Sequence, residues 1–215
     1  LDYFRHMSYL DELNDVQREA VVNYEGPTLI VAGPGSGKTR VLTYRIAHFL
    51  NNGADPFGIL ALTFTNKASE AMRLRIEKIS GNNARSLYMG TFHSVFARVL
   101  RVEAPRIGYP SNYTIYDTED SKSLIKTIVK EQGLDDKIYK PNQVYNRISS
   151  MKNSLITPQM YAEDGELIAE DRDQRKPAMG NLYKIYCERC FKSGAMDFDD
   201  LLVLWLRLLR EHPDV

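Results

Sequence analysis

The fold of this chain is decided by the stretch Leu29-Ile30-Val31-Ala32-Gly33-Pro34-Gly35-Ser36-Gly37-Lys38-Thr39-Arg40. Its first residues are apolar, and the β-branched pair Ile30 and Val31 predicts a short buried strand over 28–31. A loop with three glycines follows, and an amphipathic run begins at Lys38. A strand, a glycine-rich loop and a helix in this order form the context that a phosphate-binding loop requires.

Each part of this loop has a physical role toward a polyphosphate. Glycines let backbone N–H groups approach the phosphate oxygens, and the dipole of the following helix places its positive end at the same anion. The ammonium of Lys38 reaches the outer phosphates, and the hydroxyl of Thr39 can hold Mg²⁺. The stretch departs from the pattern G-x-x-x-x-G-K-[ST] at its first position, where Ala32 stands. We expect a nucleotide site rather than a turn that merely joins a strand to a helix.

Length and composition allow one large or two small globular domains. The 215 residues are 43% hydrophobic and 26% charged, and 28 basic residues balance 28 acidic ones. Binding of nucleic acid would therefore depend on local patches and base stacking rather than on a global field. The absence of a long apolar run or secretory pattern, together with two cysteines, favours a cytoplasmic protein without a membrane span. Residues 1–6 read as vector-derived, with the native start at Met7.

The first half of the chain alternates strand and helix patterns, which predicts an α/β layer with a parallel sheet. The expected elements are a short helix after a cap at Asn14, a strand over 28–31, a helix over 38–52, a strand over 58–64, a helix over 66–79, a strand over 86–89 and a helix over 91–102. The nearly continuous apolar run over 59–62 indicates a strand that is covered on both faces.

From 101 to 196 the pattern predicts helices and no strand. The expected helices run from a cap at 117 or 118 to 132, from Pro141 to about 153, briefly from Pro158, and from 179 to 193, with a mobile polar connector over 164–177. A final helix over 197–212 has Asp197 as its cap and a continuous apolar face. We expect this last helix to pack on the α/β layer, so that residues 101–196 form an inserted helical subdomain.

Several stretches together resemble one family. Asn14-Asp15-Val16-Gln17 is similar to the Q motif of helicases, and residues 32–40 are similar to motif I of this family, which also begins with alanine. Further similar stretches are Thr63-Phe64-Thr65-Asn66-Lys67-Ala68 with Met72 and Arg75 (motif Ia), Gly90-Thr91-Phe92-His93-Ser94 (motif Ib) and Asp197-Phe198-Asp199-Asp200-Leu201-Leu202 (the segment returning from the helical subdomain). Each stretch after the phosphate loop is weak alone, but in this order and spacing they resemble the UvrD/Rep/PcrA-type superfamily 1 DNA helicases.

The resemblance implies a fold and a domain organisation. It implies a partial RecA-like P-loop NTPase layer, a parallel sheet with helices, over residues 8–100. It also implies an inserted all-helical subdomain over 101–196 and a helix over 197–215 that returns to the motor domain. The implied cofactors are ATP and Mg²⁺. The implied partners are single-stranded DNA, junctions between single- and double-stranded DNA, and proteins of DNA repair or replication.

The resemblance also assigns roles to residues of the nucleotide site. Gln17 would read the adenine edge through its amide, which offers a donor and an acceptor. Arg40 would lay its guanidinium plane against the base. Lys38 and Thr39 would serve catalysis, with Thr39 as the ligand of Mg²⁺. The remaining cradle residues would be Ala32, Gly33, Pro34, Gly35, Ser36 and Gly37.

A second set of residues would face single-stranded DNA. Phe64 would stack on a base, which suits a motor that moves along any sequence because every base has an aromatic face. The other implied DNA contacts are Thr65, Asn66, Thr91, Phe92 and His93, with Phe198 as a further stacking ring. Plainer readings stay open: Phe64 as core, and His93 as a hydrogen-bonding residue at a helix start.

Two further clusters are interpreted as structural. Cys187 and Cys190 form a C-x-x-C on a helix, which offers two of the four ligands of a zinc site. Asp199 and Asp200 are adjacent on a helix and point about 100° apart, which favours capping or solvated charge over a metal site.

An ATP hydrolase of this family needs a second acidic motif after an apolar strand, and we find none in the 215 residues. We therefore expect an N-terminal part of a helicase that ends before that motif and lacks ATPase by itself. One alternative is a P-loop phosphotransferase or kinase of a small substrate, whose lid would be the helical insertion. Another is a DNA-binding or protein-docking module with a vestigial nucleotide loop.

Overall fold

The structure is a computed structural model that describes residues 9–215, with the side chains at 82, 83 and 85 left out of the description. The interpretation of residues 1–6 and Met7 as a vector remnant and native start lies outside the described residues. The chain divides into two compact units, Leu1–Val95 and Phe96–Val215. Each unit is described by itself. The sequence analysis placed domain borders at 100/101 and 196/197, which differ from the border between the two units. That domain assignment stays a prediction.

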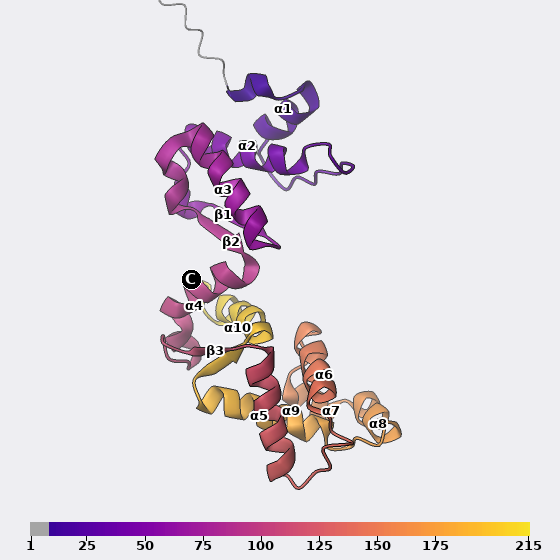
Figure 1. The fold of residues 1–215 in the computed structure, drawn as a ribbon. Coiled ribbons are helices and arrows are strands. Elements are labelled where there is room, and N and C mark those ends of the chain that lie inside the picture. Colours follow the sequence, from indigo (N-terminus) through magenta and orange to yellow (C-terminus); the bar gives the residue numbers. More distant parts are fainter. Residues whose placement is uncertain (1–8) are drawn as a thin grey trace, which may run out of the picture. The chain divides into compact units, whose positions relative to one another are not determined.

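The first unit is a strand–helix–strand unit with helices packed around it (Figure 1). Its elements are η1 (Tyr9–Glu12), α1 (Asp15–Val22), α2 (Lys38–Asn51), η2 (Pro56–Gly58), β1 (Leu60–Thr63), α3 (Asn66–Ser80), η3 (Gly81–Ser86), β2 (Tyr88–Thr91) and the start of α4 (Phe92–Glu103). Strands β1 and β2 pair in parallel from Leu60↔Tyr88 to Thr63↔Thr91, as the alternating pattern predicts. Helix α3 makes the crossover and packs on both strands, while α2 packs on α3.

The core of the first unit explains why these helices form. Met72 and Ile76 of α3 are buried against Ile46 and Leu50 of α2 and Ala61 of β1. A second cluster joins Leu13, Val21, Val41 and Tyr44, which fixes α1 on α2. Burial of such side chains contributes roughly 1.5–3 kcal/mol each, so the apolar stripes decide the packing.

Local caps begin the helices where the sequence predicts them. The Asn14 carboxamide accepts from the backbone N–H of Gln17 at 2.8 Å, and the Gln17 side chain accepts from the N–H of Asn14, which completes a capping box. Thr65 caps α3 by accepting from the N–H of Ala68 at 3.1 Å. Both caps satisfy N–H groups that the first helical turn leaves without partners.

The predicted strand over 28–31 is wrong. These residues have no regular secondary structure, and Leu29 and Val31 are 87% and 86% exposed. A strand is stabilised by a neighbour that takes up its N–H and C=O groups, and no described strand lies beside this segment. Leu29 and Val31 therefore stay at the surface of the first unit, whereas Ile30 between them is partly buried against the cluster that joins α1 to α2.

Other apolar side chains of this unit are also exposed. Leu60 is exposed, so β1 is covered less completely than its apolar run predicts. Val16 of α1 and Leu42 of α2 are apolar but exposed as well. Each lies on an element whose buried side is formed by other residues, such as Val21 on α1 and Val41 on α2.

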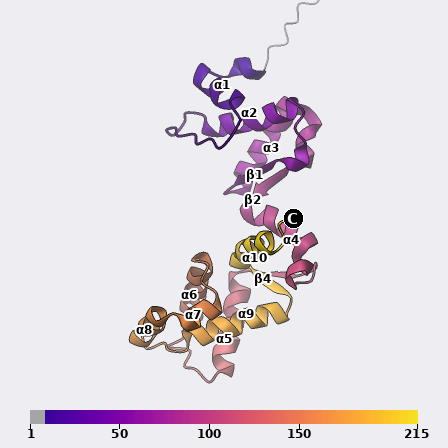
Figure 2. The same cartoon turned by 180° about the vertical axis from the view of Figure 1, so that it is seen from behind.

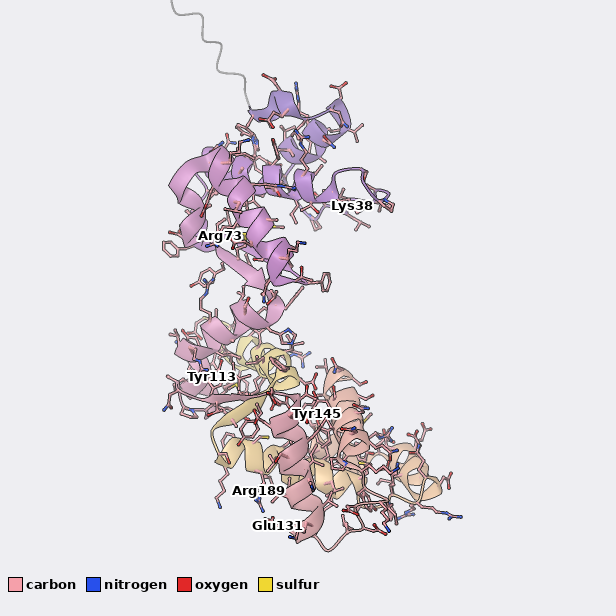
Figure 3. All side chains as sticks on the ribbon, in the orientation of Figure 1. Lys38, Arg73, Tyr113, Glu131, Tyr145 and Arg189 are labelled. Carbon is pink, nitrogen blue, oxygen red and sulfur yellow. The ribbon has the colours of Figure 1, made fainter. Side chains whose placement is uncertain are left out.

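The second unit is mainly helical, with one small sheet (Figure 2). After α4 come η4 (Ala104–Ile107), β3 (Thr114–Tyr116), α5 (Thr118–Glu131), α6 (Pro141–Asn153), α7 (Pro158–Glu163), α8 (Gly165–Asp173), α9 (Met179–Lys192), β4 (Ala195–Asp197) and α10 (Phe198–Glu211). Helices α5, α6 and α9 lie side by side around a shared core. An ion pair between Arg189 of α9 and Glu131 of α5 also joins two of these helices, and both side chains are labelled in Figure 3.

Two sequence-based expectations for this unit are wrong. Residues 114–116 and 195–197 form parallel strands β3 and β4, although no strand was expected between 101 and 196. Three residues are too few for a period-two pattern to be visible, and the pairing joins positions about eighty residues apart. The expected mobile connector over 164–177 contains α8, whose Glu170 and Asp171 carboxylates bind Arg147 of α6.

Helix α10 lies within the second unit. Its buried residues Leu201, Leu204 and Leu208 pack with Leu100 of α4 and Met196 of β4. This core accounts for the continuous apolar face that the sequence predicts for the last helix. Asp197 caps α10 by accepting from the N–H of Asp200 at 2.8 Å, as expected.

Candidate nucleotide site and nucleic-acid interface

The glycine-rich loop leads directly into the N-terminus of α2. Gly37 has φ +90°, a left-handed backbone conformation that favours glycine, and a Cβ there would come within 2.7 Å of the Gln17 Nε2 atom. No side chain caps this helix within the described residues. The N–H groups of its first turn are therefore available to an anion, and the positive end of the helix dipole faces the same place.

Lys38 lies over its own loop. Its ammonium donates to the carbonyl of Gly33 at 2.8 Å and to that of Ala32 (Figure 3). These carbonyls hold the positive charge at the mouth of the cradle, where a phosphate could replace them as its partners. The neighbouring Thr39 is exposed, and its hydroxyl has no hydrogen-bond partner in the described part of the chain, so it stays available as an oxygen ligand.

Gln17 is joined to the phosphate loop. Its Nε2 atom donates to the carbonyl of Ser36 at 3.1 Å, while its Oε1 atom accepts from the N–H of Asn14 at 3.3 Å. The donor and the acceptor of this amide are therefore both engaged by the protein. Reading an adenine edge would require these hydrogen bonds to exchange for bonds to the base.

Arg40 lies in a small network that sequence reasoning missed. Its guanidinium donates to the carbonyl of Glu12 at 2.7 Å and lies 5.4 Å from the centre of the Tyr44 ring. The hydroxyl of Tyr44 donates to the Glu12 carboxylate, and burial together with this bond raises the pKa of Tyr44. Their spacing in sequence, twenty-eight and thirty-two residues, gives no local signal that could have revealed the cluster.

The loop and this network share one cavity of about 810 Å³. Its lining residues are Tyr9, Glu12, Gly33, Gly35, Gly37, Lys38, Thr39, Arg40, Tyr44, Arg75, Lys78 and Ile79. Four cations and one carboxylate line it, which suits a polyphosphate, and the volume lies in the range of small-molecule sites. The residues present therefore fit a nucleoside triphosphate with Mg²⁺: Thr39 would hold the metal, and the loop and its cations the phosphates. A bound Mg²⁺ would add positive charge at the outer phosphates.

A separate aromatic surface forms where β1 and β2 end. Phe64 follows β1 and is 91% exposed, which excludes the reading of this residue as core. Phe92 follows β2, and the two ring centroids lie 5.7 Å apart at an interplanar angle of 42°. Since parallel strands present their carboxyl ends at one edge, the phosphate-loop unit carries two neighbouring rings beside the starts of two helices.

The polar residues of this edge start the two helices. Thr65 caps α3, and the Thr91 Oγ1 atom accepts from the N–H of Ser94 at 3.2 Å. A Cβ at Gly90 would lie 2.5 Å from the Ser94 hydroxyl and 3.0 Å from a Val95 methyl, so a larger residue at this corner would require these side chains to move. The expected contacts Asn66 and His93 are both exposed beside these caps.

The remaining predicted ring, Phe198, belongs to the second unit. It is the first residue of α10 and is 44% exposed, directly after the cap Asp197. The structure thus brings together Phe64, Thr65, Asn66, Thr91, Phe92 and His93 on one edge of the first unit. It describes Phe198 on another unit.

The two clusters interpreted as structural are located in the second unit. Burial raises the pKa of Cys187 and of Cys190 to about 12, so both are poor nucleophiles and ligands at neutral pH. Asp200 takes part in the capping box of α10, but it is buried rather than solvated. In residues 9–215 no three metal-binding side chains of the His, Cys, Asp and Glu types gather in one place. None of the described helices combines the length and the apolar character needed to cross a membrane.

The fold is a mixed α/β fold, mostly helical with two small parallel sheets, and the site carries a phosphate-loop motif. Comparison with known families agrees: the UvrD/REP helicase N-terminal domain matches residues 13–215. The chain therefore belongs to the UvrD/REP helicase family.

Curated relatives show the same relationship. The chain is 43% identical over 203 residues to the ATP-dependent DNA helicase PcrA of Staphylococcus epidermidis, an alignment that covers 94% of this chain and 27% of the relative. It is 41% identical over 207 residues to the protein of the same name from Staphylococcus aureus, covering 96% and 28% of the two chains. The chain thus spans little more than a quarter of the length of these relatives.

Proposed function

We propose that residues 1–215 form the ATP- and single-stranded-DNA-binding part of an ATP-dependent DNA helicase that translocates on DNA and unwinds it. Its first unit would be part of a RecA-like motor layer, and the helical part of the second unit an inserted subdomain. The PcrA relatives named above support the activity. The observation that carries the proposal is the pair of neighbouring rings, the exposed Phe64 and the partly buried Phe92, on the same compact unit as the phosphate loop.

Lys38 and Thr39 would act on the outer phosphates. The Lys38 ammonium would leave the carbonyls of Ala32 and Gly33 and bind the β- and γ-phosphates, while Thr39 would hold Mg²⁺. Arg40 and Gln17 would contact the base. Both make hydrogen bonds within the protein, so nucleotide binding would rearrange the contacts of η1 and α1 as well as the loop.

Phe64 and Phe92 would contact bases, with Thr65, Asn66, Thr91 and His93 beside the sugar-phosphate backbone. Two helix N-termini at this edge favour phosphate groups through their N–H groups and dipoles. Aromatic stacking tolerates every base and contributes about 1–3 kcal/mol for each one. Phe198 would add a further stacking surface.

The proposal is tested by two titrations on the intact protein. Fluorescently labelled single-stranded DNA is titrated with wild type, Phe64→Ala and Lys38→Ala, and nucleotide binding is measured by the melting shift that Mg-ATP produces. We expect Phe64→Ala to weaken the DNA and Lys38→Ala to weaken the nucleotide. DNA binding that Phe64→Ala leaves unchanged, combined with phosphate transfer from ATP to a small acceptor, would favour a phosphotransferase instead.

A second measurement concerns ATP turnover. The 215 residues contain no apolar strand that ends in an Asp-Glu pair, so they lack the carboxylate that would prepare the attacking water. Residues 1–215 alone are therefore expected to show no DNA-stimulated ATPase. Turnover by this piece that disappears with Lys38→Ala would show that another residue supplies the base.

A further inference from the structure

A lysine is buried in the second unit. Lys152, near the end of α6, is 3% exposed, and its Nζ atom lies 2.7 Å from the Asp197 Oδ2 atom and 2.7 Å from the Asp200 Oδ1 atom. The Tyr186 hydroxyl of α9 donates to the same Asp197 oxygen at 2.9 Å. One ammonium thus joins α6 to the start of α10 through two carboxylates.

Stability alone gives no reason for this arrangement. Val144, Ile148 and Met151 of α6 are buried in an apolar cluster, and apolar residues in place of Lys152 and its two carboxylates together would continue that surface. Replacing a buried ion pair by apolar side chains is often neutral or stabilising, because removing charges from water is costly. What the ion group supplies is a defined geometry for the atoms that it contacts.

The atoms held in this way belong to the turn around Phe198. The Asp197 Oδ1 atom accepts from the N–H of Asp200 at 2.8 Å, and the Asp200 Oδ2 atom accepts from the N–H of Asp197 at 3.2 Å. The other oxygen of each carboxylate, Asp197 Oδ2 and Asp200 Oδ1, takes no part in the capping box and binds Lys152. The next residue of α6, Asn153, donates to the Asp199 carboxylate at 3.0 Å. The last two residues of α6 therefore hold the carboxylates of the two residues that flank Phe198 in the sequence, Asp197 and Asp199.

We propose that Lys152 is a positioning residue for nucleic-acid binding: it fixes the turn over 197–200 so that the half-exposed Phe198 ring is presented to a base of single-stranded DNA. Asn153 supports the same turn from the surface. The proposal rests on the proposed function, because it assigns to Phe198 the stacking role given there. The proposal adds that residues of α6 determine how the Phe198 ring is presented to the base.

Removing the ammonium has two consequences for the turn. Asp197 and Asp200 would remain buried and repel each other, so that the turn moves until one of them is solvated or protonated. A displaced turn would present the Phe198 ring at a different angle. Stacking depends on a flat face at van der Waals distance, so the contact weakens even when the ring is present.

The test is a double-mutant cycle on the intact protein with Lys152→Met, Phe198→Ala and the double variant. The probe is a single-stranded oligonucleotide with one 2-aminopurine, whose fluorescence falls when the base stacks. We expect each single variant to weaken DNA binding about 10-fold and to reduce the fluorescence change. A 10-fold loss of affinity lies within the range expected for one lost stacking contact. The double variant should be no weaker than Phe198→Ala alone, since Lys152 acts only through the ring.

The outcomes separate the two proposals. If Lys152→Met weakens DNA binding equally with and without the Phe198 ring, the positioning role is overturned. The same holds if a folded Lys152→Met binds like wild type while Phe198→Ala does not. If Phe198→Ala itself leaves affinity and fluorescence unchanged, the stacking role of Phe198 in the proposed function fails. Nucleotide affinity, measured with Mg-ATP, should stay within about twofold in all variants because the phosphate loop belongs to the other unit.

A milder variant covers the case in which Lys152→Met does not fold. Asn153 is exposed, so Asn153→Ala removes the bond to Asp199, together with two bonds to Ser149 within α6, and leaves the buried ion group in place. It should weaken DNA binding about twofold in the presence of Phe198 and not at all in its absence. The matched control is Asn142→Ala, an exposed asparagine at the start of the same helix, which should bind like wild type. An Asn153→Ala protein that binds like wild type would overturn the proposal in that case.

Discussion

The ring centroids of Phe64 and Phe92 lie 5.7 Å apart, although the two residues are separated by a helix and belong to the ends of different strands. Their neighbourhood follows from the parallel pairing of β1 with β2, which brings Thr63 opposite Thr91. The two rings form an apolar surface, and the Phe64 ring of this surface is exposed to solvent. An exposed aromatic surface of this kind is a feature that binding, rather than stability, explains.

Phe64→Ala is expected to lower the affinity for single-stranded DNA about 10-fold and to change the free energy of unfolding by less than about 0.5 kcal/mol. The ring is almost fully exposed, so its removal leaves no cavity. The two effects are measured by DNA titration and by urea unfolding. The matched control is Leu74→Ala, which truncates an exposed apolar side chain of α3 and should keep wild-type DNA affinity. A loss of more than about 2 kcal/mol in Phe64→Ala would reinstate the core reading.

Gly37→Ala should weaken nucleotide binding and destabilise the first unit by roughly 1–2 kcal/mol from the left-handed backbone alone. The added Cβ also meets Gln17, so a further part of the effect depends on that side chain. Gly26→Ala is the matched control, because Gly26 has a similar φ of +74° and no atom within 4 Å of the added Cβ. Thermal unfolding with and without Mg-ATP checks both effects. If Gly37→Ala lowers the melting temperature equally in the wild-type and Gln17→Ala backgrounds, the contact between the added Cβ and the Gln17 side chain is contradicted.

Lys38→Met should abolish the melting shift that Mg-ATP produces and leave the melting temperature of the free protein nearly unchanged. The side chain is exposed, and within the described residues its ammonium donates to two carbonyls of its own loop, which water can replace. Lys67→Met, on the first turn of α3, removes another exposed charge and should keep the full shift. A shift that survives in Lys38→Met would place the phosphates elsewhere in the cavity.

Asp200 should make the stability of the second unit depend on pH. Burial raises the pKa of Asp200 to about 6, with a further rise from neighbouring Asp197, although Lys152 acts in the opposite direction. The native state therefore binds a proton that the unfolded chain releases near its ordinary pKa of 3.8. This contribution to stability is present below about pH 4 and is lost as the pH rises through about 6.

Asp200→Asn removes that dependence. The stability of wild type relative to Asp200→Asn should accordingly fall between pH 4 and pH 6.5, measured by urea unfolding at several pH values. Asp197 acts with the opposite sign: burial opposes its charge, but Lys152 lowers the pKa of Asp197, so its contribution is lost as the pH falls below 3.8. Asp199→Asn, outside the contact of the ammonium, should show the wild-type dependence. If the free energies of unfolding of wild type and Asp200→Asn differ by the same amount at every pH, the buried position of the Asp200 carboxyl is contradicted.

The sequence by itself determined the elements whose causes are local. Asn14, Asp117 and Asp197 cap the helices that the pattern predicts, because a cap needs only N–H groups two or three residues away. The phosphate loop, its following helix and the family relationship also follow from adjacent residues. Helix bounds such as Pro141–Asn153 agree with the prediction within a residue or two because the apolar period continues to the cap.

Only the tertiary structure decided what depends on distant partners. The apolar run over 28–31 reads as a strand, yet strand formation requires a neighbouring backbone, and no described strand lies beside it. Strands β3 and β4 exist because Thr114 meets Ala195 across the second unit. Likewise no local feature of the sequence marks Lys152 as buried, and only the approach of Asp197 and Asp200 makes its burial tolerable. Backbone pairing and charge burial are set by groups far apart along the chain, whereas caps and helical periods are set within a few residues.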